Sequence, residues 1–136
     1  KSACATCHPA GSSGGALAAS MLGSIDRLKT GYEKALAVLT KAEHAGMEVS
    51  QPLFELNEAK TTLIKARATI HGFDQALLDK EVEPGVAVSE KAYARGVKAM
   101  NELQFRRKGL AISTLIIIAL IIGLILKIRQ MERKPK

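Results

Sequence analysis

The sequence at residues 109–126 is GLAISTLIIIALIIGLIL, a run of eighteen residues without a charged side chain. Apart from Ser113 and Thr114, every residue in the run is apolar or glycine. As a helix it would be about 27 Å long, close to the thickness of the hydrocarbon core of a bilayer. A chain of 136 residues has too little other material to bury such a helix on all sides. The run therefore predicts a transmembrane helix, which we place at residues 109–127.

The basic charge of the chain gathers on both sides of this span. The formal net charge is +7, but residues 1–105 hold 12 basic and 12 acidic side chains, so the whole excess lies in residues 106–136. Such charges beside a span indicate membrane topology rather than a nucleic-acid surface, so we expect membrane lipid and no nucleic acid as partners. The basic residues are Arg106, Arg107 and Lys108 before the span, and Lys127, Arg129, Arg133, Lys134 and Lys136 after it. The larger group predicts a cytoplasmic tail at residues 128–136 and a periplasmic N-terminal part, in a bacterial inner membrane.

Residues 16–80 have the periodicity of two helices. Apolar or small residues recur three and four positions apart in each, and a short loop beginning at Gly46 separates the two stripes. Ser50 is expected to cap the second helix, with Pro52 in its first turn, Gly72 interrupting it and Asp74 able to cap a continuation. The stripes are Ile25, Leu28, Tyr32, Ala35, Leu39, Ala42 and Gly46, then Leu56, Ala59, Leu63, Ala66, Ile70, Phe73 and Leu77. We predict that they face each other in an antiparallel helical hairpin.

A third helix is predicted over residues 81–108. Glu81, Glu83 and Pro84 are typical of a first helical turn. A weaker helical periodicity follows at Val86, Tyr93, Val97, Met100 and Leu103. No proline separates this helix from the span, so we expect it to continue into the membrane. The predicted fold class is all-α.

The N-terminal residues 1–15 contain the motif that suggests chemistry. Cys4-Ala5-Thr6-Cys7-His8 fits C-x-x-C-H, the pattern of covalent haem attachment. Two thiols at this spacing reach the two vinyl groups of a porphyrin, and the imidazole of the next residue then lies beneath the iron. We predict haem c bound through Cys4 and Cys7, with His8 as the proximal axial ligand. Because turn-forming residues follow the motif, residues 1–15 are expected to form a haem-binding loop.

Other uses of the two cysteines remain open. A structural zinc ion needs four ligands, and the chain offers only the two thiols and the scattered His44 and His71. A disulfide or a thioredoxin-like redox pair is the remaining alternative, but no alternation of strands and helices surrounds the motif. A haem also needs walls on both faces, which three preceding residues cannot supply. We therefore expect an upstream part of a longer chain, or a partner subunit, to complete the pocket.

The sixth iron ligand is less constrained by the sequence. His71, near the end of the second predicted helix, is the candidate distal axial ligand, to this haem or to one held upstream. His44 falls at the opposite end of the hairpin, so the two histidines are not expected to serve one iron. Met21 and Met47 could ligate a haem, but packing explains them more simply.

These residues together resemble a known family. The haem motif, the segments KAEHAGMEVS at 41–50 and ARATIH at 66–71, and LKIRQ at 126–130 after one span are similar to the C-terminal module of membrane-anchored multihaem cytochromes c, of the cytochrome c3 or doubled C-x-x-C-H class. The resemblance implies thioether bonds at Cys4 and Cys7, His8 as proximal ligand and His71 as distal ligand. Multihaem proteins carry several such motifs and this sequence carries one. The others would lie upstream, or the chain is a monohaem relative.

The resemblance implies electron transfer between a quinone-linked membrane partner and periplasmic or extracellular acceptors, together with other haem domains or cytochrome subunits. No cluster of acid and base groups accompanies the motif, so we expect an electron carrier and not an enzyme. The alternative is a structural membrane anchor or docking subunit without a redox role. A membrane sensor is disfavoured, because residues 128–136 are too few for an output domain.

Overall fold

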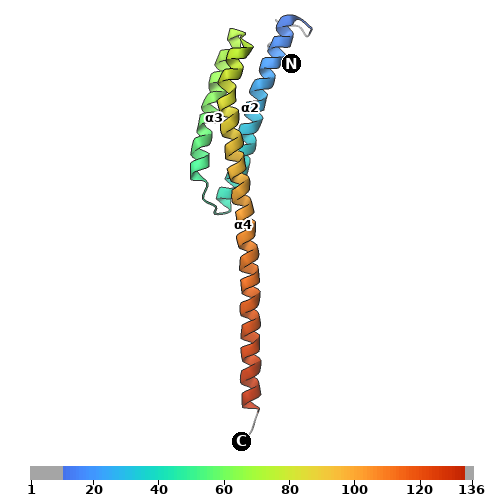
Figure 1. Cartoon of the computed structure of the whole chain (residues 1–136), viewed down its shortest axis with the longest axis vertical. Coiled ribbons are helices and arrows are strands. Elements are labelled where there is room, and N and C mark those ends of the chain that lie inside the picture. Colours follow the sequence, from blue (N-terminus) through green and yellow to red (C-terminus); the bar gives the residue numbers. More distant parts are fainter. Residues whose placement is uncertain (1–10, 134–136) are drawn as a thin grey trace. The chain divides into compact units, whose positions relative to one another are not determined.

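The computed structural model describes residues 11–133, which fold into helices without a strand in this range (Figure 1). Helix α2 spans Ser13–His44, α3 spans Ser50–Thr69, the short 3-10 helix η1 spans Ile70–Gly72, and α4 spans Gln75–Glu132. The chain divides into two compact units, Lys1–Met100 and Asn101–Lys136, and α4 contributes to both. The predicted all-α class, with three helices of which the last is long, is confirmed.

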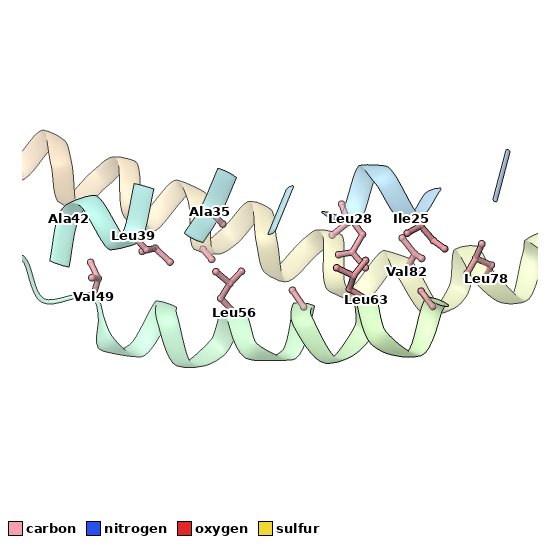
Figure 2. Packing of buried hydrophobic residues seen from close by; sticks show 14 of the residues in the cluster. Ile25, Leu28, Ala35, Leu39, Ala42, Val49, Leu56, Leu63, Leu78 and Val82 are labelled. Carbon is pink, nitrogen blue, oxygen red and sulfur yellow. The ribbon is translucent and has the colours of Figure 1, made fainter. Parts of the chain in front are cut away.

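The first unit is a three-helix bundle around one apolar core. Figure 2 shows side chains of α2, α3 and α4 pointing into the same interior. On each helix the buried positions follow the alternating spacing of three and four that lets helices pack along a continuous seam. The core consists of Met21, Ile25, Leu28, Ala35, Leu39, Ala42, Val49, Leu56, Ala59, Leu63, Ala66, Leu78, Val82, Val86, Ala92 and Ala99.

Contacts between the helices define their directions. Arg27 of α2 pairs with Glu83 of α4 at 2.7 Å, and further along both helices Gly96 lies against Val38, so α2 and α4 run parallel. Arg95 of α4 instead pairs with Glu55, near the start of α3, so α3 runs antiparallel to α4. The bundle therefore has one end where α2 begins and η1 lies, which we call the His71 end. At the other, the His44 end, α2 passes into α3.

At the His44 end, Gly46 caps α2 as the sequence predicts, but the predicted cap of α3 at Ser50 is wrong. Gly46 has a φ of 79°, and the N–H groups of Gly46 and Met47 donate to the carbonyl oxygens of Glu43 and Ala42 at 2.9 and 3.0 Å. Such paired bonds satisfy the last carbonyls of a helix and favour glycine at the left-handed position. Ser50 is the first residue of α3 and not its cap. Its N–H and hydroxyl both donate to the Glu48 carboxylate.

The predicted start of the third helix at residue 81 is wrong. α4 begins six residues earlier, at Gln75, and Pro84 lies inside it. The start is set by Asp74, whose carboxylate accepts the N–H of Leu77 at 3.0 Å, while Leu78 and Val82 bury their side chains in the core. That burial outweighs the hydrogen bond that Pro84 removes from the helix. Pro84 is thus a proline tolerated within the helix and does not mark its start.

The predicted stripes also need correction at their ends. The pattern places Phe73 and Leu77 on the buried stripe of the second helix, but 46% and 47% of their surfaces are exposed. Phe73 ends that helix, because its φ of 51° lies in the left-handed region. Tyr93, on the third predicted stripe, is 45% exposed.

The buried face of α4 consists largely of small residues. They are Gly85, Ser89, Ala92, Gly96 and Ala99. A Cβ atom on Gly85 would lie 2.8 Å from Thr62 Cγ2, and one on Gly96 would lie 2.6 Å from Val38 Cγ1. The backbone of α4 therefore lies so close to α3 at Gly85, and to α2 at Gly96, that a Cβ atom at either position would overlap with the neighbouring helix.

α2 begins earlier than the turn-rich composition suggests. The predicted loop includes residues 13–15, yet they form the first turn of α2. Ser12 explains the difference, because its hydroxyl accepts the N–H of Gly15 at 3.0 Å and caps the helix.

The second unit contains the remainder of α4, from Asn101 onward. Side chains from residue 104 to residue 133 are all exposed, including the apolar run at 109–126. The hydroxyls of Ser113 and Thr114 donate to the carbonyl oxygen of Leu110 at 2.9 and 2.8 Å. Their polar groups are thus satisfied within the helix, as a lipid environment requires. Of the described helices, this one is long and apolar enough to cross a membrane.

Candidate functional site

The three residues of the haem motif, Cys4, Cys7 and His8, lie outside the described residues. In the sequence, His8 stands four positions before Ser12, the residue that caps the start of α2.

His71 lies in η1, at this same end, and its side chain is exposed. η1 ends here because Phe73 turns the chain, and the N–H of Phe73 donates to the carbonyl oxygen of Ile70 at 3.3 Å. The topology thus places His71 at the end of the bundle where α2 begins. The side chain is accessible to a ligand.

His44 occupies the corresponding place at the other end. It is the last residue of α2, it is exposed, and the full length of α3, about 30 Å, separates it from η1. Met21 is buried in the core, and Met47 packs against the core. Their positions agree with a packing role.

Apolar side chains are exposed near His71. Phe73 follows it in the turn, and Leu77 lies in the first turn of α4. About half of each of these two side chains is accessible to solvent, although the sequence pattern placed both in the core. A flat, apolar porphyrin would cover exposed apolar side chains of this kind beside a candidate ligand.

A polar cluster joins α2 to α4 close to this end. The Ser24 hydroxyl donates to Asp79 Oδ1 at 2.6 Å, and Gln75 Nε2 donates to Ser24 Oγ at 3.2 Å and to Asp79 Oδ1 at 2.8 Å. The hydrogen bond from Ser24 lowers the pKa of Asp79 most, followed by that from Gln75, and the charge of Arg27 acts in the same direction. The cluster holds the start of α4, and with it the turn that carries His71, against α2.

This cluster was not predicted from the sequence. Gln75 and Asp79 are four residues apart, the spacing of neighbours on a helix surface, but they precede the predicted start of the third helix. Gln75 Oε1 is buried and makes no hydrogen bond within residues 11–133.

A second polar cluster joins α3 to α4 away from this end. Glu55 accepts hydrogen bonds from Gln51 at 3.0 Å and from Arg95 at 2.9 Å, and Lys91 lies 3.8 Å away. The bond from Gln51 lowers the pKa of Glu55 most, followed by that from Arg95. The carboxylate of Glu55 is thus already paired within the chain, so this cluster stabilises the packing of α3 against α4.

A shallow groove of about 700 Å³ lies between α2 and α4. It is lined by Gly23, Asp26, Arg27, Thr30, Gly31, Lys34, Glu90 and Tyr93. Its two acidic and two basic side chains give it no preference for ions of either sign.

No group of three or more His, Cys, Asp or Glu side chains that could hold a metal ion occurs among the described residues. Comparison of the chain with protein-family models, with curated proteins and with solved structures finds no match.

Proposed function

We propose that this chain is part of a membrane-anchored c-type cytochrome that transfers electrons through a covalently bound haem. The observation that carries the proposal is the motif Cys4-Ala5-Thr6-Cys7-His8, whose last residue stands four positions before Ser12, the N-cap of α2. The thioether bonds would form at Cys4 and Cys7, and His8 would be the proximal ligand.

The position of His71 supports its role as the distal axial ligand. It is an exposed histidine at the end of the bundle where α2 begins, and the apolar residues Phe73 and Leu77, which follow it in the sequence, are exposed as well. Two imidazole ligands leave the iron no open position for a substrate, which suits electron transfer. In this proposal the upstream chain or a partner subunit supplies the remaining walls of the haem pocket.

The exposed apolar part of α4 supports anchoring in a bacterial inner membrane. Such an anchor would keep the haem near a quinone-linked membrane partner, with acceptors in the periplasm or beyond. The greater basic charge after the span favours a periplasmic haem and a cytoplasmic C-terminus.

The direct test is the visible spectrum of the reduced chain, expressed with a periplasmic haem-attachment system. We expect a sharp α band that survives denaturation, because the haem is bound covalently. The double variant Cys4→Ser/Cys7→Ser should lose the band and keep its helical circular dichroism. A wild-type chain without the band, or with zinc or a disulfide at the two thiols, would refute the proposal.

His71 and His44 form a matched pair for testing the distal ligand. His71→Ala should convert the haem from low to high spin and change its reduction potential, since an axial ligand is lost. His44→Ala should change neither, because His44 lies at the other end of the bundle. An unchanged spin state and potential in His71→Ala would remove His71 from the site.

The second candidate is a structural membrane anchor without a redox role. The observation that favours it is the bundle itself, which builds a complete core from its own three helices in a chain that also carries a membrane-length helix. A chain that folds, inserts into membranes and binds no haem would establish this alternative.

A further inference from the structure

The helix surface just before the apolar run carries an unbalanced positive charge. Arg106, Arg107 and Lys108, here called the basic triplet, are consecutive and exposed, so they point in directions that cover more than half of the helix circumference. Arg106 pairs with Glu102, one turn earlier. Within residues 11–133, Arg107 and Lys108 make no ion pair, and no acidic residue follows them before Glu132.

Orientation in the membrane does not account for the triplet. The more basic side of a span usually lies in the cytoplasm, and the larger group of basic residues comes after the span. Basic residues before the span reduce that excess. In the proposed orientation, the rule therefore does not explain why these three residues are basic.

The spacing places the triplet at headgroup depth. Lys108 and Lys127 enclose the uncharged run, and the nineteen residues from one to the other extend about 28 Å along a helix, the thickness of the hydrocarbon core. Long basic side chains at such a position direct their charges into the interface. A guanidinium group there matches the geometry of a phosphate.

We propose that the basic triplet binds the phosphate headgroups of anionic phospholipids in the leaflet that surrounds it. In a zwitterionic lipid the negative charge of the phosphate is neutralised by the lipid's own ammonium group. An anionic lipid has a net negative charge, which can pair with Arg107 and Lys108, the two side chains of the triplet without an ion pair among the described residues. The proposal rests on the membrane anchoring described above and is independent of the haem.

The absence of tryptophan from the chain allows a local test. Phe105 is 78% exposed and directly precedes the triplet, so the variant Phe105→Trp provides a single fluorophore at that depth. The whole chain carrying this change is inserted into vesicles of phosphatidylcholine that contain brominated phosphatidylglycerol or brominated phosphatidylcholine. Quenching then gives the relative association constants of the two lipids next to the triplet.

We expect an association constant roughly fivefold higher for phosphatidylglycerol, about the factor that one Lys or Arg provides at an anionic surface. Adding Arg107→Gln and Lys108→Gln should bring the ratio close to one. Lys98→Gln, an exposed lysine of the bundle, is the matched control and should leave the ratio unchanged. Molar salt should weaken the preference, and inorganic phosphate added in solution should not abolish it if a lipid headgroup is the ligand.

Equal quenching by the two lipids, or a preference that survives in the double Gln variant, overturns the proposal. Displacement by inorganic phosphate would reassign the triplet to a dissolved anion. An absence of quenching by either lipid would refute membrane insertion as well. Because the reduced haem spectrum is measured separately, these failures are distinguishable from failure of the haem assignment.

Discussion

The single residue Gly96 shows why α4 packs so closely against α2. The site of its missing Cβ is 2.6 Å from Val38 Cγ1 and 3.4 Å from the backbone nitrogen of Leu39. Val38 is β-branched and has few rotamers with which to move away. We predict that Gly96→Ala lowers the free energy of unfolding by about 1–2 kcal/mol, because overpacking outweighs the better helix propensity of alanine. Urea unfolding of the bundle, followed by circular dichroism in detergent, measures the change.

Gly23 provides the control for this prediction. It lies in α2, and a Cβ built on it meets no atom within 4 Å. Gly23→Ala should therefore stabilise the bundle by about 0.5–1 kcal/mol through helix propensity alone. If both alanine variants were stabilising, the close approach at Gly96 would be refuted.

Asp79 makes the stability of the bundle depend on pH. Its hydrogen bonds with Ser24 and Gln75 lower its pKa from 3.8 in the folded state. The stabilisation is therefore present above about pH 4 and is lost as the pH falls through the folded pKa. We predict that Ser24→Ala destabilises the bundle at pH 6 and that the difference from wild type shrinks near pH 3. A difference that stays constant over this range would contradict the assignment.

At the scale of elements, α4 is notable for the proline it tolerates. Pro84 is exposed and lies ten residues into the helix, where it cannot donate to the carbonyl oxygen of Lys80. We predict that Pro84→Ala raises the free energy of unfolding by roughly 1–3 kcal/mol, since it restores that bond and removes the steric conflict. Pro52→Ala in the first turn of α3 is the control, and it should change stability little because an N–H at that position has no partner within the helix. Similar effects of the two changes would contradict this account.

The same residues explain how far the elements could be predicted. The stripes of α2 and of most of α3 were correct, because large apolar residues alternate there with charged ones. The buried face of α4 was not recognisable, because hydropathy scales give Gly85, Ser89 and Gly96 little weight and only their contacts reveal the seam. The sequence indicated that Asp74 could cap a continuation of the second helix, but not that this continuation and the third helix are one, because sequence alone does not measure whether the burial of Leu78 outweighs Pro84.

At the scale of the whole molecule, the apolar part of α4 is long and apolar enough to cross a membrane. Ile117 lies at the middle of the run at 109–126 and is exposed. We predict that Ile117→Arg removes the chain from membranes or displaces the span, since arginine at the centre of a bilayer costs about 2.5–3.5 kcal/mol or more. Ala94→Arg, at an exposed position of the bundle, should leave insertion unchanged. Flotation with vesicles after alkaline extraction measures both.

Part of the candidate site was predicted from the sequence alone. The haem motif is local, so its five residues suffice to suggest it. His71 was named from the sequence as a candidate ligand, but only the fold shows that it lies at the end of the bundle where α2 begins. The contacts of Ser24 with Gln75 and Asp79 join positions more than fifty residues apart, and no local sequence pattern predicts contacts at that separation.

The close contacts at Gly85 and Gly96 also prevent α4 from shifting lengthwise by one sequence repeat relative to α2 and α3. Gly85 and Gly96 are eleven residues apart, whereas the seam of the bundle repeats every seven. A shift of α4 by one repeat would bring Ala92 and Leu103, or Leu78 and Ser89, to the two narrowest points, and each of these side chains is too large for the gap. Among registers related by this repeat only one is therefore open, and α4 cannot be displaced along α2 by a full repeat.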